Sequence, residues 1–373
     1  DGDEFFKIKR SKIRGQISNG MICGPDEIGL GPKTDGIMEL PEDAEVGMAG
    51  ADYFKINEDI VFEIGLTPNR SDAMSHIGVA RDLKAVLNSR GDDLKMCMPS
   101  IKDFKIDNKD LTIDVKIESE SLCPRYSGVS ISNVTVNESP DWLKHKLLSI
   151  GINPINNIVD VTNYVLHETG QPLHAFDTEK ILGKEIIVKT LSNDTNFITL
   201  DESNRKLSDN DLMICNAKEP MCIAGVFGGL DSGVTKNTNS IFIESAYFDP
   251  TSIRKTAKYH KLNTDASFRY ERGCDPNITV YALKRAALLI QELCGGVISS
   301  DVVDVYPNPI EDFSINFSFN NLNKLIGEEL DRNLVKSIIK NLEIKIIEEN
   351  DDSLSLLVPP YRTDVRREVD VIE

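Results

Sequence analysis

The order of predicted strands and helices between about Leu111 and Tyr306 constrains the fold more than any other feature of the sequence. Strands are predicted at 111–119 and 126–136, a helix at 138–153, further strands at 185–191, 212–216, 222–229 and 240–248, and a final helix at 278–296. A doubly wound parallel sheet requires strands and helices to alternate regularly, and these do not. The order therefore predicts an α+β fold.

The rest of the chain divides into smaller sections, giving predicted domains at 1–47, 48–105, 106–309 and 310–373. Residues up to 47 alternate short β-like pieces with glycine-rich turns, as in part of a small all-β unit. The second section holds a helix whose apolar face we expect to carry Ile77, Ala80, Leu83 and Leu87. The last holds two helices and a hairpin with its turn at 350–352, an order that resembles a winged helix.

The helix predicted at 138–153 has local signals at both ends. Ser139 is placed to cap it, Pro140 to occupy its first turn, and Gly151 to end it. These signals predict its boundaries more closely than its apolar pattern does.

Charge and cysteine content limit the partners and the compartment. The 373-residue chain carries a formal net charge of −18, so we expect any nucleic-acid contact to be local, and residues 253–273 are the densest basic stretch. Seven cysteines without a CxxC pair indicate reduced thiols in a cytoplasmic protein. No apolar run is long enough to span a membrane, and the missing initiator Met leads us to expect a fragment of a longer protein.

One of only five histidines, His174, lies in the segment GQPLHAFD. It follows Pro172 in a segment with Gly and Pro, so we expect it on a loop, with Asn163 preceding it in DVTNYV. An imidazole off any apolar face is a candidate for proton chemistry. The pattern equally fits two residues that only bond backbone groups of an irregular loop.

Glu244 stands inside the strand-like segment SIFIESAYF. A carboxylate there either faces water or points into a pocket, where it needs a hydroxyl or amine partner. The run CIAGVFGGLDSG, residues 222–233, follows a strand with glycines that permit close approach of a ligand. It matches neither GxGxxG nor a Walker loop, so it predicts no nucleotide cofactor.

Three acidic residues near the C-terminus, Asp364, Asp370 and Glu373, are candidate ligands for a hard cation. Asp370 and Glu373 are three residues apart and share a helix face, so their oxygens are placed to bind Mg²⁺ together. A solvated acidic helix start explains the same spacing.

Six motifs in order carry a resemblance that spans essentially the whole chain. They are EIGLTPNRSDAMSHIGVARDL, NYVLHETGQPLHAFD, MCIAGVFGG, FIESAYFDP, TDASFRYERGCDP and VPPYRTDVRREVDVIE. Together they resemble the bacterial phenylalanine-tRNA ligase β subunits. The resemblance implies the end of an OB-fold tRNA-binding domain, part of the small domain around it, an editing domain and a winged-helix-like domain. It also implies an α subunit that carries the aminoacylation site, an α2β2 heterotetramer, tRNA(Phe) as partner, and ATP used by the full enzyme.

The resemblance also implies roles for single residues in the hydrolysis of mischarged Tyr-tRNA(Phe). Glu244 matches the residue that recognises the tyrosine hydroxyl, and His174 and Asn163 match residues of the hydrolytic centre. Ala224 and Ala266 match small residues that line the pocket. We further infer that the glycine-rich run beginning at Gly225 offers N–H groups to an oxyanion or to the terminal adenosine.

For the acidic residues, the resemblance implies a Mg²⁺ site formed by Asp364, Asp370, Glu373 and one further residue beyond this chain. We therefore expect the metal to be weakly held or absent here.

Three functions remain to be separated. The first is an editing-bearing β subunit, which the resemblance implies. Such a site is needed because an apolar pocket rejects an added hydroxyl by only about a hundredfold. The second is a tRNA-docking and assembly subunit whose editing centre is inactive. The third is a metal-dependent hydrolase unrelated to tRNA, which the absence of a His/Cys ligand cluster near His174 disfavours.

Overall fold

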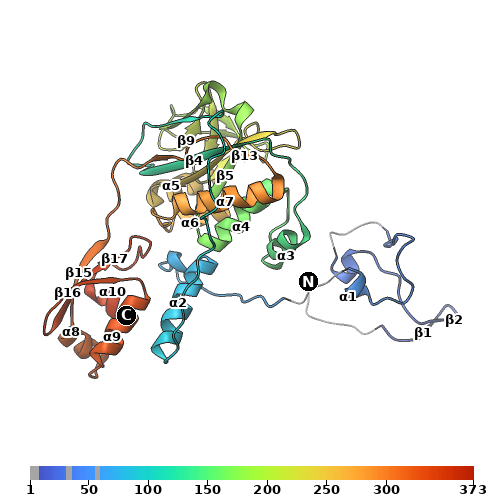
Figure 1. Cartoon of the computed structure of the whole chain (residues 1–373). Helices are drawn as coiled ribbons and strands as arrows, with labels where there is room; N and C mark the ends of the chain where they lie inside the picture. The colour runs from blue at the N-terminus through green and yellow to red at the C-terminus, as the bar shows by residue number, and fades with distance from the viewer. Residues whose placement is uncertain (1–7, 31–35, 55–58) are drawn as a thin grey trace. The chain divides into compact units, whose positions relative to one another are not determined.

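The computed structural model describes residues 8–30, 36–54 and 59–373, which divide into two compact units between Ile60 and Val61 (Figure 1). In the first unit, β1 (Ser11–Ile13) and β2 (Gln16–Ser18) form an antiparallel hairpin. Its two-residue turn, Arg14 and Gly15, has φ of 47° and 86°, as a tight hairpin turn requires. A short helix, α1 (Gly50–Tyr53), follows. The OB fold expected for residues 1–47 stays a prediction.

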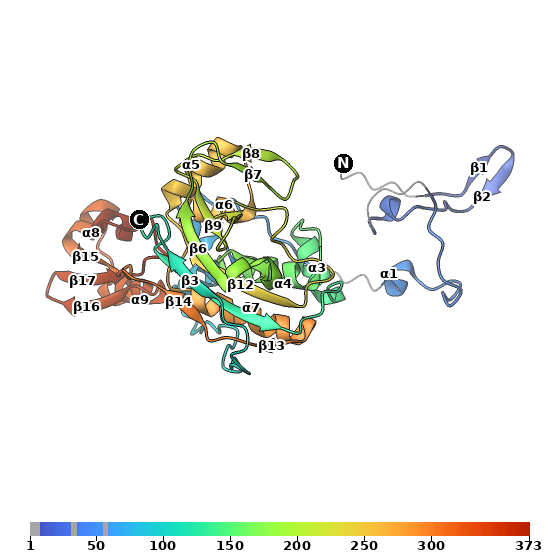
Figure 2. The ribbon, with the colours of Figure 1, turned by 90° about the horizontal axis from the view of Figure 1, so that it is seen from above.

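Two five-stranded sheets form the centre of the second unit. The first sheet has the order β11-β10-β9-β6-β3, of which β9, β6 and β3 are labelled in Figure 2, and the second contains β13-β4-β12-β5 with β14 also paired to β4. The first sheet consists of β3 (Asp114–Ile117), β6 (Glu185–Thr190), β9 (Leu212–Cys215), β10 (Pro220–Ile223) and β11 (Phe227–Gly228). The second consists of β4 (Arg125–Ser132), β5 (Leu173–Asp177), β12 (Ser240–Tyr247), β13 (Val297–Ile298) and β14 (Val303–Val305). A separate hairpin joins β7 (Asn196–Ile198) to β8 (Asn204–Lys206).

The strands of the second sheet bury both faces because their residues alternate between two apolar clusters. Phe176, Phe242 and Ala246 belong to the cluster shared with the first sheet. Ala175 and Ile243 belong to the cluster on the opposite face, shared with the helices α3 (Asp141–Ser149), α4 (Asn157–Thr169) and α7 (Thr279–Cys294). Two shorter helices, α5 (Pro250–His260) and α6 (Asp265–Tyr270), contribute to the cluster between the sheets.

The remaining helices and strands lie outside the two central sheets. They are α2 (His76–Ser89), β15 (Phe313–Ser318), α8 (Phe319–Ile326), α9 (Arg332–Asn341), β16 (Lys345–Glu349), β17 (Ser353–Val358) and α10 (Glu368–Ile372), with four 3-10 turns, η1 (Asp26–Ile28), η2 (Ser71–Ala73), η3 (Thr178–Lys180) and η4 (Leu182–Lys184). The strands β15-β17-β16 form a sheet with its own apolar core, and the hairpin turn at 350–352 is confirmed. The winged-helix topology of this part stays a prediction.

The mixed α+β fold class is confirmed, but three local expectations are wrong. His174 lies in strand β5 and not on a loop. Ser139 does not cap α3, which begins at Asp141, because the Ser139 hydroxyl donates to Asp160 at 2.5 Å. Leu83 is 54 % exposed and does not share the buried face of α2 with Ile77. Among the described residues, no helix has the length and apolar content that crossing a membrane requires.

Candidate active site

Strand pairing places two of the candidate residues side by side. Glu244 in β12 lies directly opposite His174 in β5 and, on its other side, opposite Gly128 in β4. Directly opposite residues of an antiparallel pair have their Cβ atoms about 5 Å apart and share one face. Glu244 is on the face of Phe242, and the His174 ring lies 4.4 Å from that of Phe176, so both side chains point between the two sheets. The register therefore assembles the pair.

The Glu244 carboxylate is almost completely buried. It is 5 % exposed, and its Oε2 accepts a hydrogen bond of 2.8 Å from the hydroxyl of Tyr126, itself 0 % exposed. Within the described residues, no hydrogen bond occupies the second oxygen, Oε1. Burial raises the pKa of Glu244 to about 8, and the Tyr126 hydrogen bond opposes that rise. The site thus holds a carboxyl group with one oxygen available to a second donor.

His174 presents a ring nitrogen without a partner. The residue is partly exposed, but its Nε2 is buried and makes no hydrogen bond within the described residues. The ring reaches toward the first sheet, because a Cβ at Gly228 of β11 would lie 3.5 Å from its Cε1. Burial lowers the pKa of His174 to about 4, so the imidazole is neutral at pH 7. A neutral imidazole nitrogen in this position is able to accept a hydrogen bond from water.

The loop between β10 and β11 contains Ala224 and Gly225. Gly225 has φ of 65°, and a Cβ there would lie 2.8 Å from Phe248 and 2.9 Å from Tyr270, so only glycine fits. The N–H of Ala224 is already bonded to Leu212, whereas that of Gly225 makes no hydrogen bond within the described residues. Gly225 is thus one of the amide groups of the glycine-rich run that remain available to an oxyanion.

Ala266 lies on α6, beside this loop. The helix begins with a Thr264 capping box, and the Thr264 hydroxyl also donates to the Val226 carbonyl at 2.9 Å. Ala266 is partly buried against the cluster that contains Ala224. The two expected pocket residues therefore border the same apolar cluster as Glu244 and Tyr126.

Asn163 is not brought to His174. It lies on α4, whose Val161 and Val165 pack into the cluster on the opposite face of the second sheet. The Asn163 side chain makes no hydrogen bond among the described residues, and His174 points to the other face. A catalytic role for Asn163 stays a prediction that this arrangement does not support.

The three C-terminal acids do not form a metal site. Asp364 accepts a hydrogen bond from Asn69, and Asp370 accepts from the backbone and side chain of Arg367, which lowers its pKa. Glu373 is exposed at the end of α10. Across residues 8–30, 36–54 and 59–373, no three His, Cys, Asp or Glu side chains gather closely enough to bind a metal. The side chains as arranged do not fit Mg²⁺.

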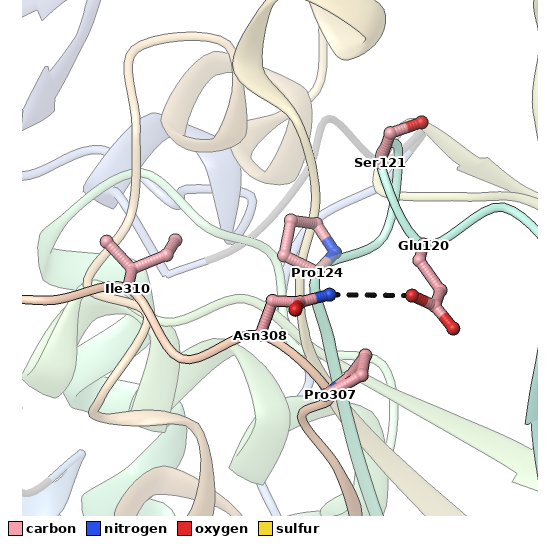
Figure 3. Close-up of a pocket in the computed structure, with 6 residues that line it drawn as sticks. All are labelled: Glu120, Ser121, Pro124, Pro307, Asn308 and Ile310. Atoms are coloured by element: carbon pink, nitrogen blue, oxygen red, sulfur yellow. Dashed lines mark hydrogen bonds between the residues drawn. The ribbon is translucent and has the colours of Figure 1, made fainter.

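Two hollows in the described part of the chain lie away from these residues. One, of about 500 Å³, is lined by Glu120, Ser121, Pro124, Pro307, Asn308 and Ile310 (Figure 3). The other, of about 20 Å³, has room for a single water between α2 and the segment 269–275. Neither is lined by Glu244 or His174.

Sequence reasoning missed Tyr126 and Thr264, the partners of the candidate residues. Tyr126 reads as an ordinary apolar strand residue, and nothing local marks its hydroxyl as bonded to a distant carboxylate. Thr264 did carry a signal, because Thr with Ser267 three positions on is a helix-start pattern.

The chain matches two domain families that define its class. Residues 122–295 match the B3/4 domain, and residues 315–373 match the tRNA synthetase B5 domain. The B3/4 match contains the Glu244–His174 pair and most strands of the two central sheets, but not β3, β13 or β14. This combination places the chain among proteins built from aminoacyl-tRNA synthetase domains.

Relatives identify the family within that class. The chain is 55 % identical over all 373 residues to a phenylalanine–tRNA ligase β subunit of Bacteroides fragilis strain YCH46, covering 46 % of it. It is 56 % identical over the same length to that of Bacteroides thetaiotaomicron, with 46 % covered, and 41 % identical over 368 residues (99 % of the chain) to that of Geobacter metallireducens, with 45 % covered. The chain belongs to the phenylalanine–tRNA ligase β-subunit family, and it spans about half the length of these relatives.

One solved structure, an N-terminal fragment of the phenylalanyl-tRNA synthetase β subunit from Pyrococcus horikoshii, is 15 % identical with a TM-score of 0.37 and 82 % of each chain covered. That likeness is too weak to support a conclusion about the fold.

Proposed function

We propose that this chain carries a hydrolytic site that removes tyrosine wrongly attached to tRNA(Phe). The observation that carries the proposal is the register of the second sheet, which sets a buried carboxyl group opposite a neutral imidazole with an unpartnered nitrogen. The carboxyl group of Glu244 suits recognition of a hydroxyl, and the imidazole nitrogen of His174 suits the binding of a water molecule. Membership of the β-subunit family supplies the substrate class.

Glu244 selects tyrosine in this proposal. Its contact with Tyr126 shows that this carboxyl group accepts a hydrogen bond from a phenol at 2.8 Å, and Oε1 remains for the phenol of a substrate. Once the carboxyl group is ionised, at pH values above its pKa of about 8, a hydrogen bond to it contributes about 1.5–3 kcal/mol, and phenylalanine offers no donor to replace it. The expected preference for tyrosyl over phenylalanyl ester is therefore roughly 10- to 150-fold.

His174 positions the attacking water in this proposal and does not act as an efficient base. Catalytic bases work best with a pKa near the operating pH, and a pKa of about 4 lies far below it. The neutral Nε2 accepts a hydrogen bond from water, whose oxygen attacks the ester carbonyl carbon. The bond from that carbon to the ribose oxygen then breaks, and a proton from the water passes to this oxygen, which leaves as the ribose hydroxyl.

The N–H of Gly225 is the donor that we assign to the oxyanion formed during this attack. It is free of other hydrogen bonds among the described residues and lies on a loop held by the Thr264 contact to Val226. A positioned backbone donor of this kind typically contributes 10²- to 10³-fold to the rate.

The broader role follows the family. We propose that the chain acts within a phenylalanine–tRNA ligase β subunit, with an α subunit, tRNA(Phe), ATP and Mg²⁺ as partners of the complete enzyme. In the chain itself, the carboxylates of Asp364 and Asp370 are engaged by neighbouring side chains, so no step is assigned to a metal.

The second candidate is a non-catalytic docking and assembly subunit. It is favoured by one observation, the core-like packing of the Glu244–His174 pair, to which neither of the two hollows opens. Deacylation of Tyr-tRNA(Phe) separates the two candidates. We expect hydrolysis by the chain, a loss of about 10²-fold in rate for His174→Ala, and loss of the tyrosine preference for Glu244→Ala. Equal clearance by both variants and the unchanged chain would remove the catalytic assignment.

A further inference from the structure

Helix α5 exposes a face of unpaired cations on a strongly acidic protein. Arg254, Lys255, Lys258 and Lys261 are all exposed, and residues 250–261 contain no acidic side chain. We call these four residues the α5 basic face. The chain as a whole carries a formal net charge of −18, so a local cluster of this sign stands out.

The acidic residues that contact this region are already occupied. Asp249 caps α5 at Ser252, Asp211 accepts from Thr256 and His260, and Glu271 pairs with Arg272. No ion pair joins any residue of the α5 basic face to a carboxylate within the described residues. The Arg254 side chain reaches only the backbone carbonyl of Glu271.

Helix stability does not account for all four charges. Lys258 and Lys261 are near the C-terminal end of the helix, where the helix dipole favours cations. Arg254 and Lys255 are not, and the like charges of Arg254 and Lys258 are four residues apart, which is destabilising. The cost is explained if an external anion neutralises the face.

The same helix also exposes an aromatic ring. Tyr259 is 58 % exposed, and its ring meets that of His260 edge-on at 4.8 Å. It lies beside the exposed cations Lys258 and Lys255, one and four residues away. Cations that follow a sugar-phosphate backbone, with an aromatic ring on which a base stacks, characterise single-stranded nucleic-acid sites.

The buried side of α5 packs against the candidate active site. A Cβ added at Gly225 would lie 3.1 Å from Cδ1 of Ile253, which is on α5. Helix α5 also contacts α6, which carries Ala266 (Figure 2). RNA bound to the exposed side is thereby held one helix thickness from the loop that we assign to the oxyanion.

We propose that the α5 basic face with Tyr259 binds the single-stranded 3′ end of an RNA whose terminal ester enters the site at Gly225. The proposal rests on the proposed function for the identity of the ester, but not for the binding of RNA. The phosphates contact the four cations, and one base of the unpaired end stacks on Tyr259.

Binding of fluorescein-labelled, uncharged tRNA(Phe) transcript to the 373-residue chain tests this directly. The triple variant Arg254→Ala, Lys255→Ala, Lys258→Ala is compared with a control that loses the same charge at the exposed residues Lys95, Lys102 and Lys105. We expect the triple variant to bind about tenfold or more weakly, with the slope of log affinity against log salt reduced by about 2–3. Tyr259→Ala is expected to weaken binding without changing the slope, and Tyr259→Phe to restore it.

Unchanged affinity and slope in the triple variant, or equal losses in the control, overturn the proposal. Equally tight binding of poly-glutamate assigns the face to an acidic protein and also overturns it. A second readout separates this inference from the proposed function. The triple variant is expected to raise KM for Tyr-tRNA(Phe) and to leave kcat unchanged. If the chain binds RNA through this face but hydrolyses no ester, only the proposed function is contradicted.

Discussion

The Glu244–His174 pair and the acidic residues at the C-terminus differ in one respect. The fold brings the pair together, whereas it does not bring the acidic residues together. Glu244 and His174 are distant in sequence, and the register of two strands places them opposite each other. Asp364, Asp370 and Glu373 are close in sequence, yet Asp364 faces Asn69 and Asp370 faces Arg367. Spacing along the chain was thus a poor guide to a site, because local arginine and amide donors compete for carboxylates.

The pair also differs from the C-terminal acids in what burial does to its charges. Burial raises the pKa of Glu244 to about 8, whereas hydrogen bonds from Arg367 lower the pKa of the partly exposed Asp370. Ionisation of a carboxyl group that burial keeps neutral destabilises the folded protein. Ionisation of a carboxyl group that is hydrogen-bonded to arginine does not.

The largest expected effect is on the pH dependence of stability. The pKa of Glu244 lies near 4.5 in the unfolded chain and about 8 in the folded one, so the folded state keeps a proton that the unfolded state releases. The contribution of Glu244 to the free energy of unfolding therefore falls as pH rises from 4.5 to 8, whereas the lowered pKa of His174 acts in the opposite direction between about pH 4 and 6.5. At about 1.4 kcal/mol per pKa unit, the loss amounts to several kcal/mol.

Glu244→Gln does not titrate and isolates this contribution. Urea unfolding at pH 5 and pH 8 is expected to show a smaller decline for the Gln variant than for the unchanged chain. Parallel declines in both proteins would mean that the carboxyl group is not buried as described.

Tyr126→Phe is expected to have the next largest effect. Removing the hydroxyl leaves Glu244 Oε2 without its donor, so the pKa of Glu244 rises further. Tyrosine preference should fall roughly tenfold at pH 7.5 and recover at higher pH, while the rate for Phe-tRNA(Phe) stays within about twofold. The pH profile is decisive, because a merely structural defect lowers both rates and leaves the profile in place.

The smallest effect is expected at the C-terminal acids. Asp364→Asn and Asp370→Asn, or addition of EDTA, should change deacylation by less than about twofold, because these side chains contact neighbouring donors and not the pair. A large loss with EDTA that added Mg²⁺ reverses would reinstate a metal in the hydrolysis.

Local signals predicted a good part of the fold. The final helix predicted at 278–296 is α7, the last section contains two helices, and its hairpin turns at 350–352, all as expected. Ser139 was misassigned because a distant carboxylate, Asp160, competes for its hydroxyl. His174 was placed on a loop because Gly170 and Pro172 precede it, whereas pairing with β12 draws it into a strand.

The site was predictable in its members but not in its arrangement. Glu244 stood out as a charge inside an apolar strand, and the resemblance supplied its role. Its partner Tyr126 and its neighbour His174 depend on strand register, which a single sequence does not reveal. Asn163 is the opposite case. It is close to His174 in sequence but lies on the other side of the sheet.

The central claim is that a buried carboxyl group at Glu244 selects the tyrosyl ester. The most direct measurement is the ratio of Tyr-tRNA(Phe) to Phe-tRNA(Phe) deacylation rates between pH 6.5 and 9, corrected for spontaneous hydrolysis, for the chain and for Glu244→Gln. We predict a ratio that rises through about pH 8 in the unchanged chain as the carboxyl ionises, and a low, flat ratio in the variant. The same ratio in both proteins at every pH would contradict the account.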